Sequence, residues 1–303
     1  MAIRFNGKVA IVTGAGGGLG RAHALEFAKR GAKVVVNDPG GALDGTGGNS
    51  QAAEAVVAEI KAAGGIAIAN GASVADDAGV AHLVKQTMEA FGRIDILVAN
   101  AGILRDKSFG KMELKDFEAV MEVHLMGTVK PCKAAWPIMR EQQYGRIVVT
   151  TSSTGLYGNF GQTNYGAAKA SLIGFMNSLK LEGAKDNIKV NAVCPVAGTR
   201  MTENLMPPNL LEMLKPEYVT PGVVFLASDG APSGAILTAA AGVFAAARIE
   251  ETDGVHLGQK AGADDVAANW SKIADFSTAK YYSQGSEQFQ KLFARLQDPP
   301  VVG

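Results

Sequence analysis

Three side chains in the middle of the chain have the types and spacing for acid–base chemistry. Tyr165 precedes Lys169 by four residues, and Ser152 stands thirteen residues before Tyr165. If one helix carries Tyr165 and Lys169, the spacing i, i+4 puts both on the same face. A phenol has a pKa of about 10, but a nearby ammonium group stabilises the phenolate. The set predicts that Tyr165 exchanges a proton with an alcohol or ketone whose oxygen also binds Ser152.

A glycine-rich turn near the N-terminus predicts a phosphate-binding loop. Residues 14–20 read Gly-Ala-Gly-Gly-Gly-Leu-Gly and follow the apolar run 9–13. Glycines leave out the Cβ atoms that would block a pyrophosphate at the N-terminus of the helix expected from near Leu19. The motif alone is a weak signal, and a flexible turn is the alternative. The strand before it and the helix after it favour a dinucleotide site.

Asp38 follows the second expected strand, 24 residues after Gly14. A carboxylate at this place in a nucleotide-binding fold accepts hydrogen bonds from the adenosine ribose and repels a 2′-phosphate. No arginine occurs in the next ten residues. The pattern favours NAD over NADP, although an aspartate before Pro39 also suits a simple turn.

Short apolar runs alternate with helical stretches along the first 242 residues. Nearly continuous apolar strands are typical of sheets covered on both faces, and the alternation predicts a parallel sheet with helices on both sides. The prediction is a three-layer α/β Rossmann fold with a doubly wound parallel sheet of about seven strands. The expected strands are residues 9–13, 33–37, 66–70, 94–100, 146–151, 189–194 and 236–240.

After Gly242 the alternation stops. Residues 243–303 form an expected C-terminal extension, with one helix around Trp270 and another around Phe293. Apolar residues at helical spacing usually pack against something, so we expect this extension to pack on the core or on a neighbouring subunit. Closing over a site is the alternative that the pattern leaves open.

Composition excludes several classes of function. The 303 residues hold 29 basic and 29 acidic side chains without a basic run, which argues against nucleic acid binding. The longest uncharged apolar segment, residues 235–247, is too short to span a membrane. Two cysteines favour a reducing compartment. We expect no metal site, and because the C-terminus ends without a peroxisomal address we expect a cytoplasmic location.

Together these motifs resemble the short-chain dehydrogenase/reductase family. The glycine-rich turn, Asn100-Ala-Gly, the serine, tyrosine and lysine, and Pro195-Val-Ala-Gly fall in the family's order between residue 5 and about residue 242. The resemblance implies hydride transfer with a nicotinamide cofactor, Tyr165 as the proton carrier, and a homodimer or homotetramer built on helices at 113–142 and 164–186. The implied catalytic residues are Ser152, Tyr165 and Lys169, of which Ser152 and Tyr165 also bind substrate. The implied cofactor-binding residues are Gly14, Gly18, Leu19, Gly20, Asp38, Ser73, Val74, Asn100, Tyr165, Lys169, Val196, Ala197 and Gly198.

A narrower resemblance rests on loop residues. Residues 37–41, 102–106, 123–125, 157–161 and 200–202 are similar to the (3R)-hydroxyacyl-CoA dehydrogenase units of the peroxisomal multifunctional enzymes type 2. This implies NAD-dependent oxidation of a 3-hydroxyacyl-CoA. Other alcohols (a steroid, a sugar or a carrier-bound thioester) and a non-catalytic NAD sensor are the alternatives.

Two features stand apart from these patterns. His124 occupies a position where most of the broader family has asparagine, and either its side chain or only its carbonyl could hold a proton-relay water. The alanine-rich segment 239–247 replaces larger side chains, and we expect it to reshape the substrate pocket. The purpose of the glycine-rich stretch at 40–48 does not follow from the sequence.

Overall fold

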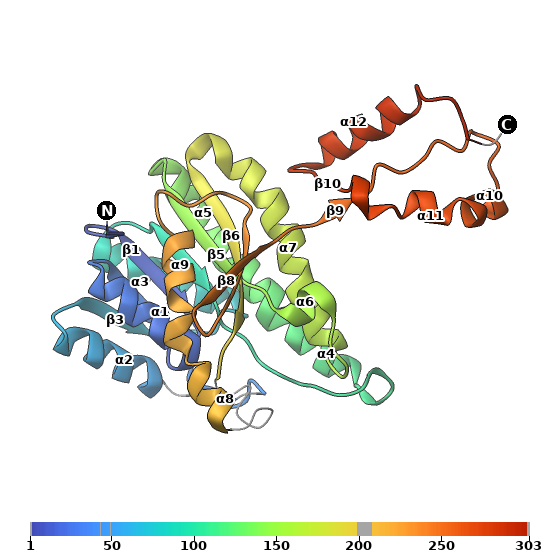
Figure 1. Ribbon diagram of the computed structural model, residues 1–303. Coiled ribbons are helices and arrows are strands. Elements are labelled where there is room, and N and C mark those ends of the chain that lie inside the picture. Colours follow the sequence, from blue (N-terminus) through green and yellow to red (C-terminus); the bar gives the residue numbers. More distant parts are fainter. Residues whose placement is uncertain (1, 43, 49, 199–207, 302–303) are drawn as a thin grey trace. The chain divides into compact units, whose positions relative to one another are not determined.

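The computed structural model describes residues 2–42, 44–48, 50–198 and 208–301 (Figure 1). An eight-stranded sheet forms the core, in the order β3-β2-β1-β4-β5-β6-β7-β8. Each neighbouring pair from β3 to β7 is parallel. The expected α/β Rossmann fold is therefore confirmed. The strands are β1 (Val9–Thr13), β2 (Lys33–Asn37), β3 (Ile66–Asn70), β4 (Ile96–Ala99), β5 (Gly145–Thr150), β6 (Ile188–Val196), β7 (Ile236–Ala240) and β8 (Val243–Ala247).

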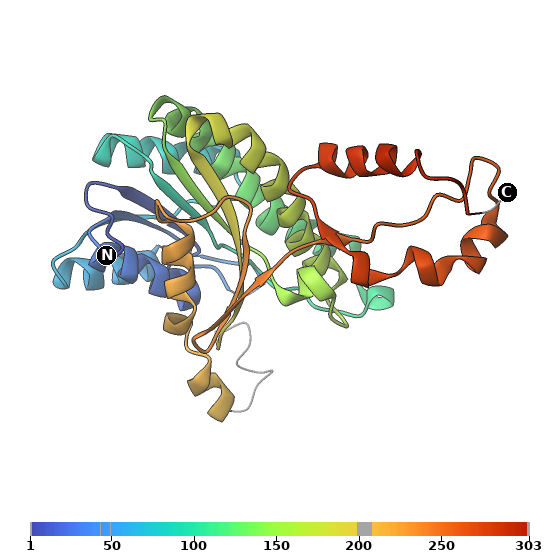
Figure 2. The same cartoon turned by 45° about the horizontal axis from the view of Figure 1, so that its top comes forward.

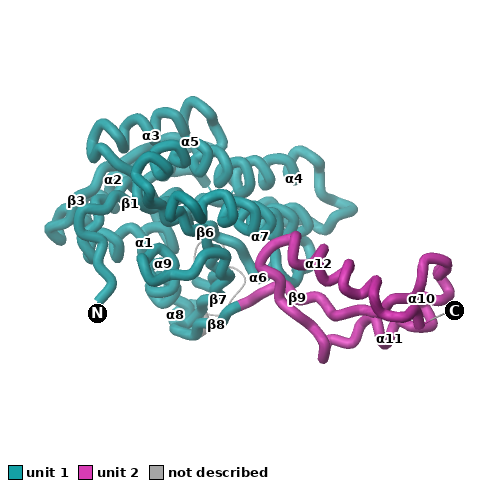
Figure 3. Tube along the Cα trace, turned by 90° about the horizontal axis from the view of Figure 1, so that it is seen from above, with its two compact units in different colours: residues 1–246 teal, residues 247–303 magenta. Residues whose placement is uncertain are grey.

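Helices cover both faces of this sheet, as the views in Figures 2 and 3 show. One face carries α1 (Gly18–Lys29), α2 (Gln51–Ala62) and α9 (Thr220–Leu226), and the other carries α3 (Asp77–Phe91), α5 (Gly127–Glu141) and α7 (Thr163–Gly183). The central strands are buried along their whole length, which suits their β-branched and apolar side chains. The remaining helices of the core are α4 (Leu114–Met121), α6 (Ser153–Tyr157) and α8 (Pro208–Met213), with short helices η1 (Phe109–Lys111), η3 (Ala184–Asp186) and η4 (Pro216–Tyr218).

The helix expected over residues 113–142 contains a π-helical turn. This turn, η2 (Glu122–Met126), separates α4 from α5 and buries His124. A π turn changes the hydrogen-bond register of the backbone and is frequent at functional sites. Here the hydroxyl of Thr128 donates to the His124 carbonyl oxygen at 2.8 Å.

The eighth strand was not expected. β8 follows β7 through Ala241 and Gly242, both with positive φ (49° and 79°), the backbone pattern of a two-residue hairpin turn. Ala-Gly is not among the usual sequences for such a turn, so the sequence signal was missing. β8 is the edge of the sheet, and Val243 is 68% exposed.

The chain divides into two compact units, residues 1–246 and 247–303 (Figure 3). The division falls four residues after the boundary expected at 242, because β8 belongs to the core sheet. The second unit contains a two-stranded antiparallel ribbon in which β9 (Glu250–Glu251) pairs with β10 (Lys280–Tyr281). Asp253 forms 2.9 Å ion pairs with both Lys280 and Arg295. Its helices are α10 (Ala263–Ala268), α11 (Trp270–Ile273), α12 (Gly285–Arg295) and the short η5 (Phe276–Thr278).

Candidate active site

A cavity of about 500 Å³ opens at the carboxyl ends of the parallel strands. This edge of a doubly wound sheet is the usual place for a ligand, because the loops that follow the strands converge there. The lining residues just after β1 to β6 come from segments far apart in the sequence. They include Gly14, Asp38, Ser73, Asn100, Thr151 and Ala197.

The turn after β1 can exist only with glycine at two positions. Gly14 has a φ of +62°, and a Cβ atom there would lie 2.7 Å from the Cα atom of Ala101. A Cβ atom at Gly20 would lie 2.2 Å from the carbonyl oxygen of Gly14. The side chain of Asn100 donates to the carbonyl oxygens of Thr13 and Gly14 at 3.0 and 3.1 Å, which fixes the turn. Gly17 and Gly18 at the N-terminus of α1 therefore line the cavity without a Cβ atom in the way of a pyrophosphate, and Leu19 lines it beside them.

Asp38 stands at the end of this cavity next to the turn. Its Oδ2 accepts the Gly16 N–H at 2.8 Å and its Oδ1 accepts the Gly40 N–H at 2.7 Å. A carboxylate has about four lone-pair sites, so each oxygen can accept a further hydrogen bond from a ribose hydroxyl. Ser73, Val74 and Asn100 line the same region. The cavity thus fits the dinucleotide that the sequence predicts.

Ser152, Tyr165 and Lys169 also line the cavity. In the sheet order, β1 and β4 separate the strand before Ser152, β5, from the strand before Asp38, β2, so the two sets lie toward different ends. The Lys169 Nζ atom donates to the Thr150 carbonyl oxygen at 2.6 Å and lies 5.6 Å from the centre of the Tyr165 ring. The Thr151 hydroxyl donates to the Lys169 carbonyl oxygen at 2.8 Å, which joins the end of β5 to α7. Ser152 caps α6, since its Oγ accepts the Thr154 N–H at 3.2 Å.

Burial shifts the two titratable groups of this set in opposite directions. It raises the pKa of Tyr165 to about 12, against the opposing effect of the Ser152 hydrogen bond. It lowers the pKa of Lys169 to about 7. Loss of solvation disfavours the charged forms of both side chains. In the protein without a cofactor, Lys169 therefore does not lower the pKa of Tyr165 enough to form the phenolate, contrary to the expectation from the sequence.

His124 lies against Tyr165. The two rings meet edge to face with their centres 5.2 Å apart. The His124 Nε2 atom lies 2.8 Å from the carbonyl oxygen and 3.1 Å from the amide nitrogen of Ile103. Its Nδ1 atom is buried without a hydrogen-bond partner among the described residues. Burial holds the pKa of this imidazole well below its usual range, so the ring is neutral.

Three sequence expectations differ from this arrangement. Gly20 is buried in the packing of α1 against the turn and does not line the cavity. Gly198 also lies outside the lining, and its N–H donates to the Leu214 carbonyl oxygen. No residue of the alanine-rich segment 239–247 lines the described cavity, because this segment runs to the exposed edge strand β8. The expectation that these alanines reshape the substrate pocket therefore finds no support in the described lining and stays a prediction.

The structure adds lining residues that the sequence analysis did not assign. Gln162 donates to the Asp106 carboxylate at 2.5 Å and accepts hydrogen bonds from Thr154 and Asn159 at 3.0 and 3.1 Å. Thr154, Asn159 and Gln162 line the cavity, as Tyr165 does, whereas Asp106 does not. The glycine-rich stretch after Asp38 also lines it. Its composition was visible in the sequence, but only the structure shows which way the loop turns.

Within the described residues, no group of three or more His, Cys, Asp or Glu side chains is arranged to hold a metal ion. None of the described helices is both long and apolar enough to cross a membrane. Cys132 and Cys194 are buried free thiols.

Comparison with known sequences decides the family. Residues 8–209 match the family model of the short chain dehydrogenases. The chain belongs to the short chain dehydrogenase family. Members are oxidoreductases that use a nicotinamide cofactor. The chain is 46% identical to peroxisomal multifunctional enzyme A of Dictyostelium discoideum over 304 residues, covering 100% of this chain and 68% of the relative. It is 50% identical to a putative short-chain type dehydrogenase/reductase of Mycobacterium tuberculosis, covering 90% of this chain and 96% of the relative.

Solved structures of short chain dehydrogenases share the fold. Full-length peroxisomal multifunctional enzyme type 2 of Drosophila melanogaster superposes with a TM-score of 0.82 at 39% identity, covering 97% of this chain and 50% of that one. A 7α-hydroxysteroid dehydrogenase complexed with NADH and 7-oxo glycochenodeoxycholic acid superposes with a TM-score of 0.71 at 30% identity, covering 79% of this chain and 95% of that one. The chain thus spans half the length of the Drosophila enzyme.

Proposed function

We propose that this protein oxidises a (3R)-3-hydroxyacyl-CoA to the 3-oxoacyl-CoA with NAD. The observation that carries the proposal is that Asp38 and the glycine turn line one end of a single cavity whose other end is lined by Ser152, Tyr165 and Lys169. The resemblance of the loops to dehydrogenase units of multifunctional enzymes, and the similarity to proteins of that name, support the acyl-CoA substrate.

Each side chain at the reacting end has its own role in the proposed reaction. Ser152 binds the substrate hydroxyl, and Tyr165 as the phenolate accepts the hydroxyl proton. Lys169, held by the Thr150 carbonyl oxygen, supports the phenolate when it is charged and binds the nicotinamide ribose. The nicotinamide ring, when bound, supplies the hydride acceptor and a positive charge. Val196 and Ala197 would contact the carboxamide.

Asp38 supports the choice of NAD. Its two oxygens already accept two backbone N–H groups, so the carboxylate is held in place at the ribose end. A 2′-phosphate there would meet a fixed negative charge, and the ten residues after Asp38 offer no arginine to pair with it. We expect a strong preference for NAD over NADP.

Location and assembly stay predictions. The relatives named above include proteins whose names place them in peroxisomes and a mycobacterial protein whose name does not. A cytoplasmic location and a homodimer or homotetramer are what the sequence favours.

A substrate panel tests the proposal. Purified protein with NAD is offered 3-hydroxyacyl-CoA esters of several chain lengths, a hydroxysteroid, a sugar alcohol and a 3-hydroxyacyl carrier thioester, and NADH formation is followed by absorbance. The proposal predicts the highest kcat/KM for a CoA ester. If only the steroid is oxidised, the function is the one that the hydroxysteroid dehydrogenase likeness favours. If NAD binds and no alcohol reacts, the non-catalytic NAD sensor becomes the favoured hypothesis.

A further inference from the structure

The described part of the glycine-rich loop, residues 39–42 and 44–48, is a wall of the cofactor end of the cavity. Pro39, Gly41, Ala42, Gly45 and Gly47 all line the cavity beside Asp38. Within the loop, the Ala42 N–H donates to the Thr46 carbonyl oxygen at 2.8 Å, and the Gly45 N–H donates to the Ala42 carbonyl oxygen at 3.0 Å. Glycine-rich backbone loses much conformational entropy when ordered, so contacts from outside the loop matter for its position.

Two contacts tie the tip of this loop to the segment after β4. The Arg105 Nε atom donates to the Asp44 carbonyl oxygen at 3.1 Å. Gly45 lies against Ile103, since a Cβ atom there would lie 3.2 Å from the Ile103 Cγ2 atom. Ile103 itself lines the cavity and contacts His124. The loop tip therefore rests on the same segment that borders the reacting end.

Arg105 is held in place from two other directions. Its Nη1 atom lies 3.1 Å from the Oδ1 atom of Asp116 on α4, and Asp116 is 8% exposed. Its carbonyl oxygen accepts the Asn164 side-chain N–H at 2.9 Å, one residue before Tyr165. A guanidinium group has five donors in a fixed fork, so one side chain can bind the carboxylate and the loop carbonyl together.

We propose that Arg105 is a positioning residue that holds the glycine-rich loop against the cofactor end of the cavity and thereby strengthens NAD binding. The inference rests on the proposed use of NAD. Arg105 does not line the cavity, so its effect on the cofactor passes through the loop.

Lys107 gives a matched control. Its Nζ atom lies 3.2 Å from the Oδ2 atom of the same Asp116, and it makes no described contact with the loop. Arg105→Met and Lys107→Met each remove one ion pair from Asp116, but only the first releases the loop. Circular dichroism and a melting temperature check that both variants fold.

The first measurement is the Kd for NAD by calorimetry, without substrate or turnover. We expect Arg105→Met to raise this Kd about fivefold, the factor for one hydrogen bond of about 1 kcal/mol, and Lys107→Met to leave it unchanged. The second measurement is hydrogen–deuterium exchange of peptides covering residues 39–50 in the cofactor-free protein. We expect faster exchange in Arg105→Met than in the wild type or Lys107→Met.

A second pair of variants disturbs the neighbouring contact of the loop tip, between Gly45 and Ile103. Gly45→Ala introduces a Cβ atom against Ile103 at a φ of +87°, whereas Gly64→Ala introduces the same backbone strain at a φ of +81° with nothing within 4 Å. We expect weaker NAD binding only in Gly45→Ala. Arg105→Lys, which keeps a positive charge for Asp116 but lacks the fork that also reaches the Asp44 carbonyl oxygen, keeps the inference testable if Arg105→Met fails to fold.

The possible results separate this inference from the proposed function. Equal Kd values and equal exchange in wild type and Arg105→Met overturn the inference and leave the function untouched. Equal weakening in Arg105→Met and Lys107→Met also overturns it, because the effect then comes from Asp116. A wild-type protein that binds no NAD overturns the function, while the exchange measurement still decides whether Arg105 holds the loop.

Discussion

Tyr165 and Lys169 show how one physical cause acts on two side chains with opposite results. Burial raises the pKa of the phenol to about 12 and lowers the pKa of the ammonium group to about 7. Near neutral pH the phenol is uncharged in the protein alone. A positive charge brought beside it would favour the phenolate, so we infer that proton acceptance develops only when the cavity is filled.

The pH dependence of the two reaction directions follows from this. Oxidation needs the phenolate of Tyr165, so kcat/KM for oxidation should increase as the pH rises from about 6 to about 10, below the raised pKa. Reduction needs the neutral phenol, so its kcat/KM should not increase over the same range. Initial rates in both directions, with circular dichroism at each pH as a control for folding, test this. An oxidation rate independent of pH across that range would speak against Tyr165 as the base.

That Ser152, Tyr165 and Lys169 come together could be predicted from the sequence, and all three line one cavity, but the shifts of the tyrosine and lysine pKa values could not. The Tyr-x-x-x-Lys spacing and the upstream serine can be recognised in the sequence alone. Burial is a property of the whole fold, and so is the edge-to-face contact between His124 and Tyr165. The sequence likewise gave no sign that Thr128 engages the His124 carbonyl oxygen, since that contact depends on the π turn.

In the turn after β1, one glycine is needed for packing and another for access of the cofactor. Gly20→Ala should destabilise the fold, because its Cβ atom would lie 2.2 Å from the Gly14 carbonyl oxygen. Gly17→Ala should fold normally, because nothing lies within 4 Å of a Cβ atom there, yet it should bind NAD more weakly, because Gly17 lines the cavity. Urea denaturation and NAD calorimetry on both variants measure the two effects. A Gly20→Ala variant as stable as the wild type would contradict the packing argument.

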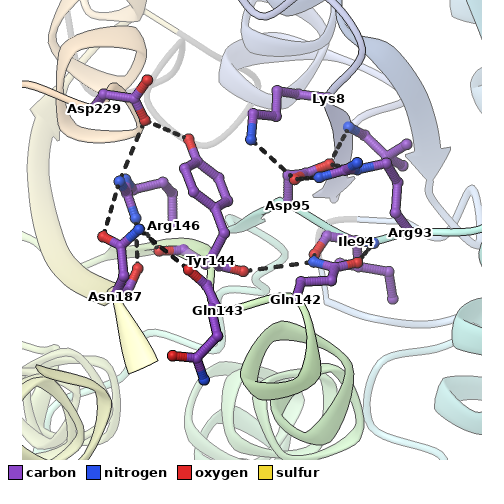
Figure 4. A network of polar contacts seen from close by, with 12 residues as sticks. Lys8, Arg93, Ile94, Asp95, Gln142, Gln143, Tyr144, Arg146, Asn187 and Asp229 are labelled. Atoms are coloured by element: carbon purple, nitrogen blue, oxygen red, sulfur yellow. Dashed lines mark hydrogen bonds and ion pairs between the residues drawn. The ribbon is translucent and has the colours of Figure 1, made fainter. Parts of the chain in front are cut away.

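A polar network joins the amino ends of four neighbouring strands, at the opposite edge of the sheet from the cavity (Figure 4). Asp95, just before β4, accepts the Val9 N–H of β1 at 2.9 Å and binds Arg93. The ring of Tyr144 lies between two cations, with the Lys8 Nζ atom 3.4 Å and the Arg146 Cζ atom 4.1 Å from its centre. These residues are distant in sequence, which is why no local pattern predicted the network.

Asp95→Ala tests how much this network stabilises the fold. The substitution leaves the buried Val9 N–H without its acceptor and removes the partner of Arg93 and Lys8. We expect a loss of about 2–4 kcal/mol in the free energy of unfolding. Glu89→Ala is the control, since its pair with Lys85 on α3 is exposed and such pairs contribute little. Equal midpoints of urea denaturation for the two variants would rule out a stabilising network.

For the whole molecule, the sequence predicted the alternating strands and helices as far as β7 but did not predict β8. The strands from β1 to β7 are largely buried in the sheet, so their sequences are mostly apolar. β8 is an exposed edge strand, and its alanines show no such pattern. In the second unit, a helix was expected correctly but its apolar side chains are not buried. Its helix α12 was expected from its apolar spacing, yet Phe289 and Phe293 are 59% and 53% exposed in the single chain.

Exposed aromatic side chains of this kind favour packing against another surface, which residues 1–246 of the same chain or a neighbouring chain could supply. The family resemblance implies a homodimer or homotetramer. We predict a particle of two or four times the 31.4 kDa chain mass. Light scattering coupled to size-exclusion chromatography, repeated over a tenfold range of protein concentration, measures it. A mass equal to one chain at every concentration would show that the prediction is wrong.

The most direct test of the central claim is NAD reduction by a pure (3R)-3-hydroxyacyl-CoA, measured for the wild type and for Tyr165→Phe with NAD binding checked in both. We expect rapid NADH formation with the (3R) epimer and little with the (3S) epimer. For Tyr165→Phe we expect a loss of at least about 100-fold in kcat with nearly unchanged NAD binding. A Tyr165→Phe variant that keeps most of the activity, or a wild type that oxidises neither epimer, would contradict it.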